Sequence, residues 1–230
     1  MPKAFRPRPG PRQAPQRRRR AGLPAEVVSE LRHAARAGKT EAAISRLERA
    51  AELLARGDAR GALAEAQKAK QLAPRSAAVR EVLGLSLYAL ERFREALTEM
   101  QAYRRMSGRA DQNHIIADCL RAVGRPDRAV PLAEEALASR RVPLAAKTEA
   151  VIVAASALAD QGKLDQALGL LRRIRTRDDV ARPEVLRVWY VTADILERAG
   201  RREEAKREFR KILRHDASAF DTAERMAQLS

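Results

Sequence analysis

Apolar residues return every three or four positions along most of this chain, in stretches that Gly, Pro or Asp interrupts. That spacing places the apolar side chains on one face of a helix. The stretch over residues 40–56 is typical, and Gly57 and Asp58 follow it. Glycine accepts the left-handed backbone that ends many helices, and aspartate can cap the next one. The pattern therefore predicts a helix over 40–56 and a second over 59–72, which ends before Pro74.

The same cycle of helix, short turn and helix continues to the end of the sequence. A helix over residues 24–37 precedes it and ends at Gly38. The pattern therefore predicts an all-α fold, with further helices over 77–90, 93–106, 112–123, 126–140, 144–161, 164–175, 183–199, 202–214 and 217–229.

A small residue recurs near the start of every second helix, at regular intervals. The dipeptides that carry it lie 34, 33 and 38 residues apart, and a fifth position follows 38 residues later: Ala62-Leu63, Ala96-Leu97, Ala129-Val130, Ala167-Leu168 and Ala205-Lys206. Periods of this length are typical of stacked helical repeats. We interpret the small residue as the place where two helices approach closely.

Composition agrees with stacked helices. Hydrophobic residues make up 45% of the chain and aromatic residues only 3%, whereas a β-sandwich uses more β-branched and aromatic residues. The periodicity favours one continuous array over two separate domains.

The repeats resemble the tetratricopeptide repeat family, in a bacterial-type arrangement of about five hairpins. The residues that carry the resemblance are Leu83-Gly84 in a first helix, Trp189 at the tryptophan position, the inter-helix glycines, and small or proline residues at later positions: Gly57, Gly124, Gly162, Gly200, Ala69, Ala136 and Pro74. The resemblance implies a right-handed α-α superhelix over residues 39–216, with an N-terminal helix over 23–38 and a C-terminal capping helix over 217–230.

The resemblance also implies a concave groove, lined by the first helix of each hairpin, that holds a protein or peptide partner. The positions that would face this groove are Glu81, Tyr88, Asp111, His114, Asp118, Arg121, Glu149, Asp160, Arg187, Tyr190 and Asp194, with Glu197 beside them. Acids outnumber bases in this set, which favours a ligand that carries Lys or Arg. Some members of the family grip a carboxyl terminus with Asn and Lys, but here Leu47, Ala51 and Val82 stand at those positions, so we expect no such clamp.

The net charge of +16 is spread unevenly. Residues 1–22 hold eight basic residues, five prolines and no acid, which predicts a disordered basic arm. Such an arm suits a nucleic acid, a ribosome or an acidic protein. It could equally fold into the chain's own groove or serve only solubility. The candidate polyanion-binding residues are Arg12, Arg17, Arg18, Arg19 and Arg20.

Candidate catalytic chemistry is sparse. His33, His114 and His215 are widely separated, so no metal site is expected, and Cys119 lacks the partners that a nucleophile needs. Gly38-Lys39-Thr40 matches the last residues of a phosphate-binding loop, but the earlier glycine that such a loop needs is missing. We therefore interpret this tripeptide as a helix boundary. We therefore predict no enzyme activity, no cofactor and no small-molecule substrate.

A single cysteine and the lack of a secretory segment near Met1 predict a cytoplasmic protein, and no apolar run is long enough to span a membrane. The sequence thus predicts a non-catalytic scaffold that binds a protein through its groove. The alternative is a protein attached to nucleic acid or the ribosome by its basic arm, with the repeats recruiting a second component.

Overall fold

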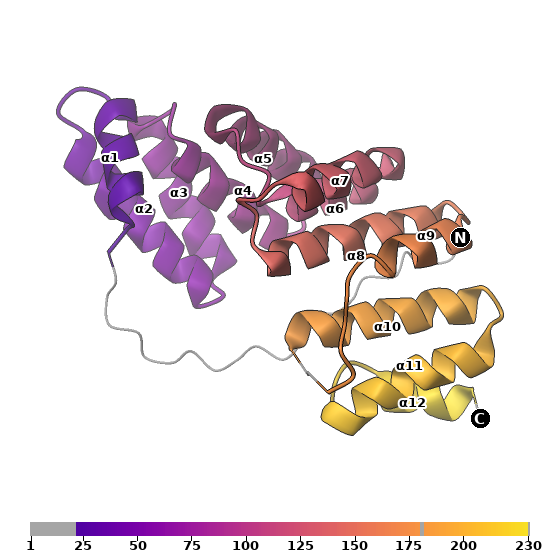
Figure 1. Ribbon diagram of the computed structural model, residues 1–230. Coiled ribbons are helices and arrows are strands. Elements are labelled where there is room, and N and C mark those ends of the chain that lie inside the picture. The colour runs from indigo at the N-terminus through magenta and orange to yellow at the C-terminus, as the bar shows by residue number, and fades with distance from the viewer. Residues whose placement is uncertain (1–21, 180–181, 230) are drawn as a thin grey trace. The chain divides into compact units, whose positions relative to one another are not determined.

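The computed structural model describes residues 22–179 and 182–229, which form twelve α-helices and one short 3-10 helix (Figure 1). No strand occurs among these residues, so the predicted all-α repeat fold is confirmed. The elements are α1 (Ala25–Ala34), α2 (Thr40–Ala55), α3 (Ala59–Leu72), α4 (Ala77–Ala89), α5 (Phe93–Ser107), α6 (Asn113–Ala122), η1 (Pro126–Arg128), α7 (Ala129–Ala138), α8 (Leu144–Asp160), α9 (Leu164–Leu171), α10 (Pro183–Arg198), α11 (Arg202–His215) and α12 (Thr222–Gln228).

The helices belong to two compact units. The N-terminal unit comprises α1 to α6, in residues 22–123, and the C-terminal unit comprises η1 and α7 to α12, in the described residues from 124 onward. Within the first, α2 packs on α3 and α4 on α5. Within the second, α8 packs on α9 and α10 on α11. Each pair is a helical hairpin of the predicted kind.

The recurring small residues lie where the helices meet. Ala62, Ala96, Ala129, Ala167 and Ala205 are all fully buried. Gly84 shows how close this packing is, since a methyl group added to it would lie 2.3 Å from the sulfur of Met100 in α5. Only glycine fits there without moving the buried side chain of Met100.

The turns inside the hairpins use a left-handed residue. Gly57, Gly124, Gly162 and Gly200 have φ angles between 74° and 83°. The turn between α4 and α5 has no glycine, and Glu91 takes this conformation instead, with φ of 58°. A side chain makes that backbone costly, so this turn carries strain that the other four lack.

Most predicted helices match the structure to within one or two residues, but four differ by more. The helix predicted over 126–140 begins as the 3-10 helix η1, so α7 starts three residues later, at Ala129. Helix α1 stops at Ala34 because the chain extends at Ala35, and the amide of Arg36 donates to the carbonyl of Leu72 at the end of α3. Helix α9 stops at Leu171, where the amides of Arg173 and Ile174 turn back to carbonyls three residues earlier.

The last helix begins five residues later than the sequence predicts. The carboxylate of Asp216 accepts hydrogen bonds from the amide and the hydroxyl of Ser218, and Phe220 follows in a left-handed conformation. This local turn competes with the helix, which starts at Thr222. None of the helices in the described part of the chain is long and apolar enough to cross a membrane.

Candidate interaction surfaces

The first helices of the C-terminal unit form a wall of paired charges. Arg187 of α10 contacts Glu149 of α8 at 2.9 Å, and Arg198 of α10 lies 3.7 Å from Asp160 at the end of α8. Burial raises the pKa of Glu149 against the opposing effect of Arg187. Three of these four residues were predicted to face the groove, and Arg198 was not.

Helix α12 covers the far end of this wall. Arg225 of α12 donates to Asp194 at 3.0 Å and to Glu197 at 2.6 Å, both on α10. Tyr190 of α10 donates its hydroxyl hydrogen to Asp221. The guanidinium of Arg225 also lies 5.4 Å from the ring centre of Phe209 in α11. One arginine thus ties α12 to α10 and α11.

Two residues predicted to face a partner are therefore covered by the chain itself. Tyr190 is 3% exposed and Asp194 is 7% exposed. Burial raises the pKa of Asp194, while Arg225 opposes that rise. The wall also carries less net negative charge than the sequence predicts, because Arg198 pairs with Asp160 and Arg225 pairs with Asp194.

The wall of the N-terminal unit is built in the same way. Tyr88 of α4 donates to Asp118 of α6 at 2.7 Å, and Arg121 donates to the other oxygen of that carboxylate at 3.0 Å. Gln112, just before α6, donates to Glu81 of α4 at 2.7 Å. Tyr88, Asp118 and Arg121 thus form one cluster, and Glu81 pairs separately with Gln112.

Glu81 and Asp111 lie near the start of α6. Burial raises the pKa of Glu81, and Gln112 opposes the rise. Asp111 accepts from the hydroxyl of Tyr103 at 2.8 Å and pairs with Arg109 at 2.6 Å. His114, also predicted to face the groove, is half-buried on α6.

Most contacts along both walls join residues about one repeat apart. The bonds from Gln112 to Glu81 and from Tyr88 to Asp118 span 31 and 30 residues. The bond from Arg225 to Asp194 also spans 31. Side chains therefore fasten α4 to α6 in the N-terminal unit, and α8 to α10 and α10 to α12 in the C-terminal unit, which orders each wall before any ligand arrives.

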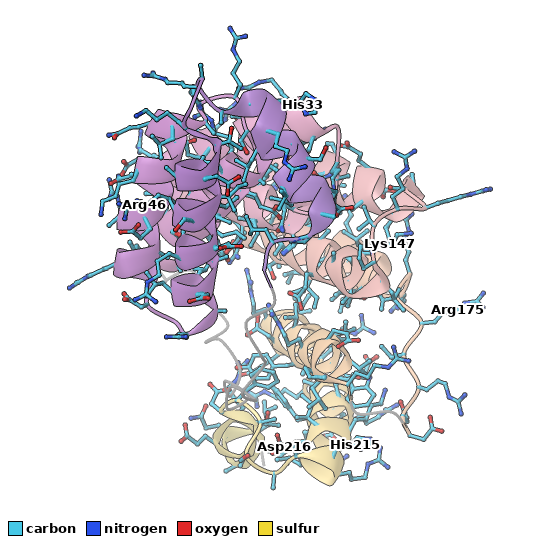
Figure 2. All side chains as sticks on the ribbon, turned by 90° about the vertical axis from the view of Figure 1, so that its left-hand side faces the viewer. His33, Arg46, Lys147, Arg175, His215 and Asp216 are labelled. Atoms are coloured by element: carbon cyan, nitrogen blue, oxygen red, sulfur yellow. The ribbon has the colours of Figure 1, made fainter. Side chains whose placement is uncertain are left out.

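Helix α1 covers the start of the wall in the N-terminal unit (Figure 2, where His33 marks α1 and Arg46 marks α2). Leu31 of α1 is fully buried against Leu47 of α2 and Val79 of α4. Val82 of α4 is half-buried beside them. Leu47 and Val82 stand where the carboxylate clamp would place polar residues, so here α1 takes up their apolar surface.

The remaining candidates fall outside these walls. The arm residues Arg12 and 17–20 lie in the segment 1–21, outside the described residues. Cys119 is buried, which raises the pKa of its thiol to about 12 and keeps it protonated. Gly38 adopts a left-handed turn between α1 and α2, as its interpretation as a helix boundary requires. The described residues contain no group of three potential metal ligands.

Sequence reasoning missed the roles of Glu30, Leu31 and Arg225, and only the role of Leu31 had a signal. Leu47 and Val82 are apolar at positions expected to face solvent, which indicates that something covers them. The sequence gives no comparable signal for Glu30 or for Arg225, which has Asp221 four residues before it as a local acid at helical spacing.

The comparisons with known proteins agree with this architecture. Residues 115–220 match a family model described as Tetratrico peptide repeat. The structure resembles YrrB, a TPR protein with an unusual peptide-binding site, with a TM-score of 0.57 and 22% identity over 81% of this chain and 92% of that one. It also resembles TTC0263, a TPR protein of Thermus thermophilus, with a TM-score of 0.62 and 17% identity over 81% and 98%.

A third similar structure is PilW, a type IV pilus biogenesis factor, with a TM-score of 0.67 and 19% identity over 82% of this chain and 89% of that one. At these identities the likeness concerns the fold. No curated protein matches the sequence significantly.

Proposed function

We propose, from the premise that this chain belongs to the tetratricopeptide repeat family, that it is a non-catalytic adaptor whose first-helix walls hold a segment of another protein. The observation that carries the proposal is the fastening of neighbouring wall helices within each unit, α4 to α6 and α8 to α10. A wall already ordered by its own side chains loses little entropy when a ligand docks. YrrB is described with a peptide-binding site, which makes a peptide the first class of ligand to test.

The wall of the C-terminal unit supports a ligand that carries charges of both signs. Arg187 and Arg198 retain side-chain exposures of 33% and 37%, and their acidic partners are less exposed. Ion pairs that remain this accessible contribute little by themselves and can exchange partners with a ligand. Opposite charges on the ligand would then give specificity and orientation more than affinity.

The test uses two charge reversals that are matched in chemistry. Asp160→Arg changes the wall, and Asp165→Arg changes a residue of α9 whose side chain is 97% exposed. Affinity capture with the full chain should return a recurrent protein with the wild type and with Asp165→Arg, and lose it with Asp160→Arg. Capture of the same proteins by all three forms would contradict the proposal.

We also propose a cytoplasmic location, since Cys119 is a free buried thiol.

A second candidate function follows from the charge of residues 1–22. Eight cations without an acid would bind a nucleic acid or the ribosome, and the repeats would recruit another component. Binding to duplex DNA should then weaken with salt, with a log-log slope of up to about −7. Deletion of residues 2–22 should abolish that slope, and an unchanged slope would exclude this function.

A further inference from the structure

Helix α1 lies on the groove side of α2 and α4 in the manner of a bound ligand. Leu31 fills the centre of an apolar site made by Leu47, Val79 and the end of α3, and Val27 and Leu23 pack beside it. The polar face of α1, including Arg32 and His33, is exposed. This is how an amphipathic helix binds in a hydrophobic groove.

A carboxylate fixes α1 in register. One oxygen of Glu30 accepts from the hydroxyl of Ser76 at 2.7 Å and from the amide of Ala78 at 3.3 Å, at the start of α4. Amides at a helix start are unpaired and favour a negative charge. The groove therefore selects an acid directly before the central apolar residue.

The attachment of α1 to the rest of the unit is concentrated in a few contacts around Glu30 and Leu31. Helix α1 has ten residues, and no side chain caps its N-terminus. The connection to α2 turns at Gly38, where the space around the Cα is open, and one backbone hydrogen bond joins Arg36 to Leu72. A helix this short is marginal by itself, so a displaced α1 would unfold and leave the groove open.

We propose that this groove binds an amphipathic helix of a partner protein and that α1 is its resident competitor. The partner helix carries an apolar residue in place of Leu31 and an acid directly before it. Its source is another protein, because the short connection through Gly38 already places α1 in the groove of its own chain. This inference rests on the adaptor function and assigns one of its ligands.

The test compares two full-length variants that introduce the same charge at adjacent positions. Leu31→Asp removes the buried residue of α1, and Arg32→Asp changes an exposed one. The probe is a fluorescent peptide with the sequence of residues 22–38. If α1 occupies the groove for about 99% of the time, its removal strengthens peptide binding about 100-fold.

We expect Leu31→Asp to bind the peptide at least tenfold more tightly than wild type, by fluorescence anisotropy, and Arg32→Asp to match wild type. A peptide with Glu30→Gln should bind severalfold more weakly, and one with Leu31→Asp should not bind. Equal binding by wild type and Leu31→Asp would overturn the proposal.

Reactivity of the Cys119 thiol shows whether the unit stays folded, since this residue is fully buried. If Leu31→Asp exposes it, a protease site inserted after Gly38 replaces the substitution. After cleavage, exchange of α1 with the labelled peptide while Cys119 stays protected supports the proposal. Exchange only together with exposure of Cys119 overturns it, because α1 is then part of the core.

Light scattering separates a further possibility. A wild-type dimer that exchanges α1 between copies would overturn the assignment to a partner protein. The capture experiment with Asp160→Arg concerns the C-terminal unit, so failure of the peptide experiment leaves the adaptor function standing. Failure of the capture experiment alone would leave the peptide result intact.

Discussion

The two terminal helices cover first-helix walls with opposite chemistry. Helix α1 places Leu31 in an apolar site and adds one carboxylate, Glu30. Helix α12 places a guanidinium, Arg225, between two acids of α10 and near the rings of Tyr190 and Phe209. One end is held mainly by burial of apolar surface, the other by desolvated charge.

The difference indicates which end can be removed. Without α1, the wall exposes apolar side chains, which a partner could cover again. Without α12, Asp194 would lose Arg225, which is the nearer of the two cations that offset its burial, and would keep only Arg198 at 4.0 Å. Removing one partner of a buried ion pair is destabilising. Helix α12 is therefore integral to its unit, whereas α1 is suited to exchange.

The chain offers one probe for each unit. Its only cysteine, Cys119, is buried in α6, and its only tryptophan, Trp189, is buried in α10. Thiol reactivity thus reports the N-terminal unit and tryptophan fluorescence the C-terminal unit. The following substitutions use both.

The largest effect is expected where the paired helices meet. Ala96→Glu and Ala167→Glu each bury a charge at a fully buried alanine, one in each unit, and should lower the free energy of unfolding by more than about 4 kcal/mol. In urea titrations, the thiol reactivity of Cys119 should report the lower stability of Ala96→Glu, and the fluorescence of Trp189 should report that of Ala167→Glu. Ala64→Glu, at an exposed site of α3, should change it little. Wild-type midpoints for both would refute the assigned repeat register.

Removal of the arginine of α12 should rank next. Arg225→Ala leaves Asp194 with only the more distant Arg198, at 4.0 Å, and should cost about 3 kcal/mol of unfolding free energy, read from Trp189 fluorescence in urea. Arg210→Ala, an exposed arginine of α11, is the control and should stay near wild type. If the two variants unfold alike, α12 is not held by charge and the contrast with α1 fails.

Two glycines should respond in opposite directions to the same change. Gly84→Ala forces a methyl group against Met100 and should destabilise the N-terminal unit by about 2 kcal/mol. Gly169→Ala, within α9, meets open space and should stabilise the C-terminal unit by about 0.5 kcal/mol. Urea denaturation measures both changes in stability, with Cys119 thiol reactivity for Gly84→Ala and Trp189 fluorescence for Gly169→Ala. Two losses of equal size would mean that Gly84 is not a site of close approach.

The strained turn should gain from glycine. Glu91→Gly relieves a left-handed side-chain conformation and should stabilise the N-terminal unit by about 1 kcal/mol, measured by Cys119 protection in urea. Arg92→Gly, next to it and with a φ of −81°, relieves no left-handed conformation and should lower stability instead. A loss for Glu91→Gly would show that its side chain stabilises the turn more than its backbone strains it.

The smallest effect concerns pH. The pKa of Glu81 is raised in the folded unit, so the folded state binds more protons than the unfolded state above pH 4.5. The contribution of Glu81 to stability therefore becomes less favourable as pH rises through this window. The difference in unfolding free energy between wild type and Glu81→Gln should decline from pH 4.5 upward. A difference that grows with pH would contradict the raised pKa.

The sequence predicts the hairpins well because the signals that define them are local. The spacing of the alanines, the apolar faces and the turn glycines together predict where the helices from α2 to α11 lie in the sequence. The terminal helices follow different rules. The bond from Arg36 to Leu72 ends α1, and the turn at Asp216 delays α12, and neither follows from helical periodicity.

The candidate walls were predicted in outline only. Tyr88 and Asp118 were both expected to face the groove, and the hydrogen bond between them joins two hairpins. Pairings of this kind depend on how far the first helix of one hairpin is shifted along the first helix of the next. That shift cannot be read from the pattern of a single sequence. Arg225 and Glu30 lie on elements whose place on the walls depends on the same displacement.

That hydrogen bond also gives the hairpins a fixed order. In α4 the residue 33 positions before Asp118 is Leu85, which cannot accept the hydroxyl proton of a tyrosine. If the α4–α5 hairpin were copied and inserted in tandem, Tyr88 of the first copy would face leucine. Shuffling these modules would therefore break a specific donor and acceptor pair, even though the alanines and glycines that shape each hairpin are nearly interchangeable.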